Sequence, residues 1–406
     1  MKSAPFRHEF PIFKRHPELA YLDNAATTQK PEPVIAAERF FYEHLNANVH
    51  RGAYRLADEA TLAYESAREK IRAWLNAASI REIIFTSGTT EGINTVALSF
   101  AAGRVTEGDA ILISAMEHHS NLIPWQQVCL LNKARLLVVP VSREGALDLV
   151  EYEKMLSTEA GRIKLVAITH VSNTLGTVNP VADMIRQAHR FGAAVLVDAA
   201  QSAATHRPDV QALDADFLVF SGHKMFGPTG TGVLYGKQKW LDAMPPSQWG
   251  GGMIRDVTFE RTLFAPSPQK FEAGTPNLAG IIGLGAAVDW LHKTGSDAFS
   301  RHIRSLLEYA TARLQTIPGL RIIGQAPEKS AIVSFLIDGI HPHDLATFLD
   351  QRQICVRAGH HCTQPLMDFL EIPGTVRASF SIYNSEDEID RLADALHAAQ
   401  AFFLKN

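Results

Sequence analysis

Cysteine is scarce in this sequence and long apolar runs are missing, which argues against a disulfide-stabilised protein and against a membrane-spanning one. Only three of the 406 residues are cysteines: Cys129, Cys355 and Cys362. Three thiols cannot build a disulfide framework, and they suit a reducing compartment. No apolar stretch reaches the length of a membrane span, and the first residues, Met1-Lys-Ser-Ala-Pro-Phe-Arg-His8, lack the apolar core of a signal peptide. We therefore expect a cytoplasmic protein.

An excess of charge of one sign is also missing. The chain has 39 basic and 43 acidic residues, a net charge of −4, and no basic run. Neither nucleic acid nor a membrane surface is therefore expected as a partner. A hydrophobic content of 46% with 20% charged residues is typical of a globular protein, and 406 residues are too many for one ordinary core. Two domains in close contact are expected.

Apolar strands alternate with amphipathic helices from residue 21 to about residue 285. The predicted strands are 82–86, 110–114, 136–139, 165–169, 195–197, 217–220 and 232–235. A helix before residue 192 has Asn179 as its expected N-cap and Pro180 at its first position; its inward positions are Val181, Met184, Ile185 and Ala188. Near-continuous apolar strands separated by helices predict a largely parallel sheet covered on both faces, with ligands at the carboxyl ends of the strands.

The pattern changes in the last third of the chain. Residues 245–275 are rich in proline and glycine and predict a loop or short hairpin. A helix over about 297–317, strands near 332–337 and 354–357, and a final helix from Ser385 predict a smaller α+β domain. The expected organisation is an N-terminal arm (1–20) packing with the small domain, a large domain (21–290) and a small C-terminal domain (291–406).

One lysine stands between two of the predicted strands, on a loop bounded by glycines. The loop is Ser221-Gly-His-Lys-Met-Phe-Gly-Pro-Thr-Gly230, with Lys224 at its centre. Burial there lowers the pKa of a lysine towards the free amine that a Schiff base requires. A surface lysine on a turn is the alternative, which Lys224 alone does not exclude.

Two further segments favour the reactive amine. Asp198 ends the strand at 195–197, where a carboxylate either pairs with a pyridinium nitrogen or caps a helix. The run Phe85-Thr-Ser-Gly-Thr-Thr-Glu-Gly-Ile-Asn94 leads from a strand into a helix, and predicts either a phosphate seat or a plain helix start. An amine, an acid and a phosphate seat in one α/β framework together indicate pyridoxal 5'-phosphate (PLP).

Short motifs along nearly the whole chain point the same way. In order they are Tyr21-Leu-Asp-Asn-Ala-Ala26, His50-Arg-Gly52, Gly88-Thr-Thr-Glu-Gly-Ile-Asn94, Glu117-His-His119, His170-Val-Ser-Asn173, Ser221-Gly-His-Lys224, Phe271-Glu-Ala-Gly-Thr-Pro-Asn277, Arg357-Ala-Gly-His-His-Cys362 and Arg377-Ala-Ser379. As a set they resemble the class V aminotransferase family of fold-type I PLP enzymes, most closely its SufS/CsdA-type cysteine desulfurases. The resemblance implies a large domain with a mainly parallel sheet covered by helices, plus a smaller C-terminal α+β domain. Ala199 and Ser87 depart from the family's usual glycine and arginine, which bears on cofactor fit and not on reaction class.

Cys362 is the residue that separates a desulfurase from its relatives. It lies in a polar loop after a predicted strand, and the nearby Arg357 favours the thiolate that sulfur abstraction needs. Cys129 and Cys355 are interpreted as small buried cysteines. The run His360-His361-Cys362 also suggests a metal, but no second Cys/His pair has zinc-site spacing, so no metal is expected.

The resemblance also implies roles for individual residues. Lys224, Cys362 and His118 are the expected catalytic residues, with His118 stacked on the cofactor ring and acting as acid and base. The other implied cofactor contacts are Asp198, Gln201, Thr89, Thr90, Asn173, Ser221, His223 and Thr275, with Thr275 donated by the other subunit of a homodimer with shared sites. Arg377 is the implied clamp for the substrate carboxylate, with Arg357, Arg51 and Asn173 as helpers. His119 is interpreted as structural.

The implied reaction converts L-cysteine to L-alanine and leaves the sulfur as a persulfide on Cys362. A SufE- or SufU-type acceptor would then take the sulfur for iron–sulfur cluster assembly, and selenocysteine lyase activity is expected as well. The rival hypotheses are another PLP enzyme of the same fold (an aminotransferase, a kynureninase-like lyase or an epimerase) and, more remotely, a non-catalytic assembly scaffold that retains the fold.

Overall fold

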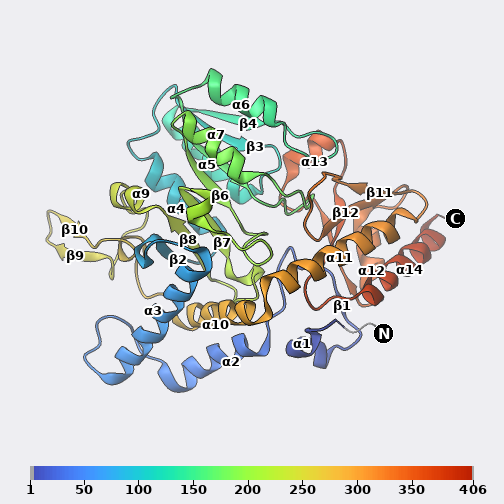
Figure 1. Cartoon of the computed structure of the whole chain (residues 1–406), viewed down its shortest axis with the longest axis horizontal. Helices are drawn as coiled ribbons and strands as arrows, with labels where there is room; N and C mark the ends of the chain where they lie inside the picture. Colours follow the sequence, from blue (N-terminus) through green and yellow to red (C-terminus); the bar gives the residue numbers. More distant parts are fainter. Residues whose placement is uncertain (1–3, 405–406) are drawn as a thin grey trace.

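A seven-stranded sheet forms the centre of the computed structural model, which describes residues 4–404, the side chains at 296 and 297 excepted (Figure 1). The strand order is β2-β8-β7-β6-β5-β3-β4, and β8 alone runs antiparallel to its neighbours. The strands are β2 (Ile83–Thr86), β3 (Ala110–Ser114), β4 (Arg135–Val139), β5 (Ile163–Thr169), β6 (Ala194–Asp198), β7 (Phe217–Ser221) and β8 (Gly232–Gly236). The predicted, largely parallel sheet is confirmed, with small shifts at the strand ends.

Helices cover both faces of this sheet. They include α3 (Arg55–Leu75), α4 (Thr89–Ala101), α5 (Ile123–Asn132), α6 (Leu149–Thr158), α7 (Val181–Arg190) and α10 (Leu278–Thr294). Successive side chains of a strand point to opposite faces. Accordingly Ile111 and Ile113 join the buried cluster that contains α4 and α5, whereas Leu112 joins the cluster that contains α3, α6, α7 and α10. Burial on both faces explains why these strands are apolar at almost every position.

The helix expected after Pro180 is α7, and its predicted inward face is buried. Its predicted N-cap was wrong. Pro180 occupies that position, and the buried Asn179 amide donates a hydrogen bond to the carbonyl of Thr169 over 2.8 Å. An amide that is held at the end of β5 cannot turn back to cap the helix.

A second, four-stranded antiparallel sheet carries the C-terminal part of the chain. Its order is β11-β12-β15-β14, and its strands are β11 (Leu320–Ile323), β12 (Ile332–Ile337), β14 (Arg357–Gly359) and β15 (Thr375–Ser379). Helices α11 (Ser296–Gln315), α12 (Pro342–Asp350) and α14 (Glu386–Phe403) contact it or one another. The single strand predicted at 354–357 is instead divided, because β13 (Ile354–Cys355) pairs with β1 (Ala20–Tyr21) before the chain enters β14.

The remaining elements lie outside these two sheets. The Pro/Gly-rich segment contains the expected hairpin, β9 (Ile254–Val257) and β10 (Thr262–Phe264). The other helices are α1 (Pro11–Arg15), α2 (Glu32–Phe40), α8 (Val210–Leu213), α9 (Gln238–Ala243) and α13 (Gln364–Leu370). None of the helices within residues 4–404 combines the length and the apolar character that crossing a membrane requires.

The domain boundaries remain a prediction, and the one at 290/291 falls inside α10. The first part of the predicted arm, residues 1–3, lies outside the described residues. The rest contacts the C-terminal part of the chain: Arg7 forms an ion pair with Glu388 of α14 at 2.8 Å, and the rings of Phe10 and Tyr383 are 4.6 Å apart.

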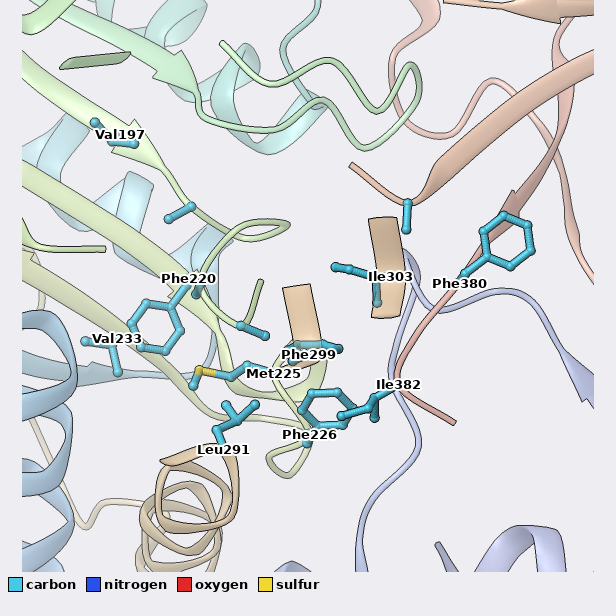
Figure 2. Close-up of a cluster of buried hydrophobic side chains, with 14 of the residues drawn as sticks. Val197, Phe220, Met225, Phe226, Val233, Leu291, Phe299, Ile303, Phe380 and Ile382 are labelled. Atoms are coloured by element: carbon cyan, nitrogen blue, oxygen red, sulfur yellow. The ribbon is translucent and has the colours of Figure 1, made fainter. Parts of the chain in front are cut away.

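A buried hydrophobic cluster fixes the loop that carries Lys224 (Figure 2). Met225 and Phe226, the two residues that follow this lysine, point into the cluster between α10 and α11. The Phe226 ring lies 4.9 Å from the ring of Trp290 and 5.8 Å from that of Phe299. Because such a ring is worth roughly 3–5 kcal/mol when fully buried, the lysine loop is anchored on the side away from the strands.

Candidate active site

A cavity of about 210 Å³ lies where the carboxyl ends of the parallel strands meet the small sheet. Most of the residues predicted from the sequence line it: Thr89, Thr90, His118, Asn173, Asp198, Gln201, Ser221, His223, Lys224, Arg357, Cys362 and Arg377. The first nine follow the strands of the large sheet, and the last three come from β14, the loop after it, and β15. Arg51 and Thr275 are exposed and do not line this cavity.

An amine and a carboxyl group both line the cavity, and each affects the pKa of the other. Lys224 ends the short turn after β7, and burial lowers its pKa to about 8, with Asp198 acting in the opposite direction. Asp198 ends β6 and is 4% exposed. Burial raises the pKa of its carboxyl, although the N–H of Ala200 (2.9 Å) and the nearby Lys224 oppose this. A lysine with a lowered pKa beside a buried acid is the combination that the sequence predicted.

The N-terminus of α4 forms one wall of the cavity. The Ser221 hydroxyl accepts a hydrogen bond from the Thr89 N–H (2.8 Å) and lies 2.9 Å from the Thr89 hydroxyl. The Thr90 hydroxyl lies 2.8 Å from that of Ser120, which the sequence had not indicated. A Cβ at Gly88 would lie 3.2 Å from the Ser221 hydroxyl, so a glycine keeps this corner open. Hydroxyls at the N-terminus of a helix are suited to an anion.

His118 presents a neutral imidazole to the same cavity. Burial foremost, and the charge of Lys224 second, lower its pKa to about 3. Its Nδ1 accepts a hydrogen bond from the N–H of Ser120 (3.1 Å), which assigns the proton of the neutral ring to Nε2. The ring therefore offers one N–H donor from a fixed position.

The neighbouring Glu117 is a residue whose importance the sequence did not reveal. It is 3% exposed and accepts three hydrogen bonds: from the Ser114 hydroxyl, the Thr169 N–H (3.0 Å) and the Asn121 amide (2.6 Å). Burial raises the pKa of its carboxyl to about 8, against the effect of these donors. Because the donors belong to the ends of β3 and β5 and to the turn after His118, Glu117 ties the histidine to the sheet.

Two arginines give the small-sheet side of the cavity its positive charge. Arg377 on β15 is 1% exposed; it donates to the carbonyl of Asn173 (2.8 Å) and to the carboxylate of Asp23 (3.1 Å). Its partner across the antiparallel ladder is Arg357, whose guanidinium has no hydrogen-bond or ion-pair partner among the described side chains. Like charges directly opposite each other in a sheet are unfavourable. Since Asp23 balances only one of them, the pair is suited to a substrate carboxylate.

Cys362 lies in the loop after β14, half-buried, and lines the cavity. His361 and Cys362 both have left-handed backbone angles, with φ of 52° and 59°, which residues other than glycine adopt at a cost. The Asn173 amide, expected to contact cofactor or substrate, donates to the carbonyl of His361 (2.7 Å) and so holds this loop. Cys129 is buried as expected, whereas Cys355 is only half-buried.

The donor set fits PLP. The cavity brings together an amine of lowered pKa, a buried acid, a helix N-terminus with hydroxyls and a neutral imidazole. Two buried polar atoms beside it, Nε of Arg377 and Nδ1 of His361, have no hydrogen-bond partner. Within the described part of the chain, no group of three or more His, Cys, Asp or Glu side chains could hold a metal ion.

Known proteins are similar to this chain in sequence and in fold. A family model described as aminotransferase class-V matches residues 20–392. A cysteine desulfurase of Synechococcus elongatus is 50% identical over 397 residues, 97% of this chain but only 63% of that longer protein. A probable cysteine desulfurase of Halalkalibacterium halodurans is 48% identical, with 99% of each chain covered. Among solved structures, the apo cysteine desulfurase of Thermococcus onnurineus NA1 has a TM-score of 0.93 at 39% identity, covering 98% of both chains. The cysteine desulfurase CsdA (S-sulfonic acid) of Escherichia coli has a TM-score of 0.91 at 39% identity, covering 99% of both.

Proposed function

The chain belongs to the class-V aminotransferase family and is similar in sequence and fold to its cysteine desulfurases, and we propose that it converts L-cysteine to L-alanine through a persulfide on Cys362. The observation that carries the proposal is that Cys362 and Lys224 line one cavity although they come from different sheets. An aminotransferase or an epimerase of the same fold has no need of a thiol at that place. The thiol therefore favours sulfur abstraction over the other reactions of the family.

Pyridoxal 5'-phosphate is the cofactor in this proposal. Lys224 would hold it covalently, and Asp198 would pair with its ring nitrogen. His118 would lie on the ring, Gln201 at its 3'-oxygen, and the phosphate among the side chains of Thr89, Thr90, Ser221 and His223. When bound, the cofactor supplies an electron sink for the bonds that break at the substrate carbon.

The residues of the chain carry out the remaining steps. Arg377 and Arg357 bind the substrate carboxylate and fix its orientation. With a pKa of about 8, part of the Lys224 population has a neutral amine near neutral pH, and this Nζ takes the proton from the α-carbon. Nε2 of His118 carries the only proton of the neutral ring and donates a hydrogen bond that orients the group it faces in the cavity.

Cys362 receives the sulfur. Its thiolate attacks the substrate's sulfur atom, an S–S bond forms, and the C–S bond breaks with its electron pair left on carbon. That carbon then gains a proton, which balances the one lost by the Cys362 thiol when it became the thiolate, and L-alanine is complete. The balance is L-cysteine plus the Cys362 thiol giving L-alanine plus the Cys362 persulfide, with no external oxidant or reductant.

The partners in this proposal follow from the resemblance. Thr275 is exposed and lies outside the cavity of its own chain, which is consistent with a homodimer in which it enters the partner's site. A SufE- or SufU-type protein would take the persulfide sulfur in the cytoplasm for iron–sulfur cluster assembly. Selenocysteine would serve as a second substrate.

Alanine production by a Cys362→Ala variant tests the proposal. We expect cysteine-dependent alanine to fall to background in this variant, and to persist in the matched Cys355→Ala variant. Undiminished alanine production without Cys362 would refute the desulfurase mechanism and favour another reaction of the family. A wild-type protein without the visible absorbance of a bound cofactor would instead favour the scaffold.

A further inference from the structure

We propose that His119 is a positioning residue that holds the Cys362 loop in its reactive place, an inference that rests on the proposed role of Cys362 as nucleophile. The mechanism above gives His119 no task, and the sequence alone suggested a structural role. The residue begins the short 3-10 turn after β3 and is half-buried, outside the hydrophobic clusters. Both its backbone and its ring are nevertheless bonded to the loop of Cys362.

The two hydrogen bonds reach the loop on either side of Cys362. The His119 N–H donates to the carbonyl of Cys362 over 2.8 Å. Nε2 of the His119 ring accepts from the N–H of Gln364 over 3.2 Å. Gln364 is the first residue of α13, and an N–H at this position has no partner within its own helix. The ring therefore caps the helix that ends the nucleophile loop.

The loop needs such restraint because its backbone is strained. His361 and Cys362 have consecutive left-handed conformations, which relax unless the surroundings enforce them. A second anchor comes from the segment after β5, where the hydroxyls of Thr174 and Thr363 are 2.8 Å apart and Asn173 holds the carbonyl of His361. The His361 ring is also bonded to Thr375 of β15 (2.8 Å). Because these anchors remain, losing the His119 ring loosens the loop without releasing it.

The position of His119 in the chain couples this restraint to the cofactor side of the site. His118 lines the cavity, and Glu117 fixes the same segment to β3 and β5. In this segment of three consecutive residues, Glu117 is hydrogen-bonded to the sheet, His118 lines the cavity, and His119 is hydrogen-bonded to the loop of Cys362. A shift of the loop relative to the imidazole is resisted by one short, rigid segment.

Two substitutions of His119 distinguish a positioning role from a purely structural one. His119→Leu removes the ring acceptor but keeps the backbone N–H, whereas His119→Gln places an amide oxygen where it can accept from Gln364. The first readout is alkylation of Cys362 by iodoacetamide in the cofactor-loaded protein without cysteine, measured by peptide mass spectrometry relative to Cys355. The second is the rate at which Cys362 gains persulfide in a single turnover.

We expect opposite changes in the two readouts. The free energy of one ordinary hydrogen bond corresponds to a change of about 3- to 10-fold in the equilibrium between the held and the released loop. In His119→Leu the alkylation of Cys362 relative to Cys355 should rise by about this factor, and the persulfide rate should fall by a similar one. The KM for cysteine should stay constant, and His119→Gln should bring both values back to within about twofold of wild type.

Two results would overturn the inference. One is a His119→Leu protein in which both readouts stay within twofold of wild type. The other is a faster alkylation of Cys362 and Cys355 alike, with a lower Tm and no rescue by glutamine, which is the behaviour of a purely structural residue. If the wild type formed no persulfide, the proposed function would fail, while the alkylation ratio would still decide whether His119 holds the loop.

Discussion

Substitution of Glu117 by leucine removes the acceptor of three hydrogen bonds in the wall of the cavity. The donors are the hydroxyl of Ser114, the N–H of Thr169 and the amide of Asn121, at 2%, 5% and 0% exposure. Each donor left without a partner costs about 1–3 kcal/mol, although the serine hydroxyl can rotate to another acceptor. Removing a costly buried carboxyl offsets part of this loss. We expect a net decrease of about 2–4 kcal/mol in the free energy of unfolding.

Glutamine at the same position is the matched control. Its carbonyl oxygen can accept from Thr169 and Ser114, but its NH2 group then faces the NH2 group of Asn121. Asn121 cannot simply turn its amide over, because its oxygen accepts from the indole N–H of Trp125 at 2.9 Å. Glu117→Gln should therefore lose about 1–2 kcal/mol, less than leucine but more than a surface substitution.

The raised pKa of Glu117 also predicts how the free energy of unfolding changes with pH. Burial raises the pKa of Glu117 from an ordinary 4.5 to about 8 in the folded protein. Between these two pH values the folded state binds the proton and the unfolded state does not, so this group's contribution to stability falls as pH rises. Urea unfolding of wild type and both variants, from pH 5 to pH 8, measures both effects. A loss below about 1 kcal/mol for leucine would show that the three donors do not depend on Glu117, and a wild-type stability that rises relative to glutamine over this range would show that the pKa of Glu117 is not raised by folding.

Three further predictions concern other parts of the site. Trace acetylation of the cofactor-free protein should titrate Lys224 with an apparent pKa of about 8, because burial disfavours its charge; a value near 10.5 would contradict the described cavity. Arg377→Lys should raise the KM for cysteine, measured by steady-state kinetics, by about 10- to 100-fold, because an ammonium cannot make the bidentate pair. An unchanged KM would show that Arg377 does not bind the substrate carboxylate. Phe226→Ala should lower the free energy of unfolding by about 3–5 kcal/mol, since the ring is fully buried beside Trp290; a thermal melt close to that of wild type would show that the cluster does not anchor the lysine loop.

Much of the large sheet and the residues at its strand ends could be predicted from the sequence because the signals are local, whereas most other cavity residues were expected from the family resemblance. Apolar runs identify strands, and the residues that follow them gather at one edge of a parallel sheet. This reasoning placed Asp198 and Lys224 together although 26 positions separate them. The N-cap of α7 was wrong for a reason that is not local, since Asn179 is held by the end of another strand.

Partners that are distant in the sequence could not be predicted. Asp23 pairs with Arg377 across 354 positions, and only the arrangement of the small sheet brings them together. Glu117 and His119 stood in a recognised motif, but their partners come from β5 and from the loop of Cys362. Thr275 and Arg51 remain predictions, because neither lines the cavity of its own chain.

Persulfide formation on Cys362 is tested most simply by the mass of the Cys362 peptide after the cofactor-loaded protein has reacted with L-cysteine and been quenched without a reductant. We expect this peptide to gain the mass of one sulfur atom, the peptides of Cys129 and Cys355 to gain none, and a Lys224→Ala variant to show no gain at all. An unmodified Cys362 peptide alongside continued production of alanine would contradict persulfide formation on Cys362.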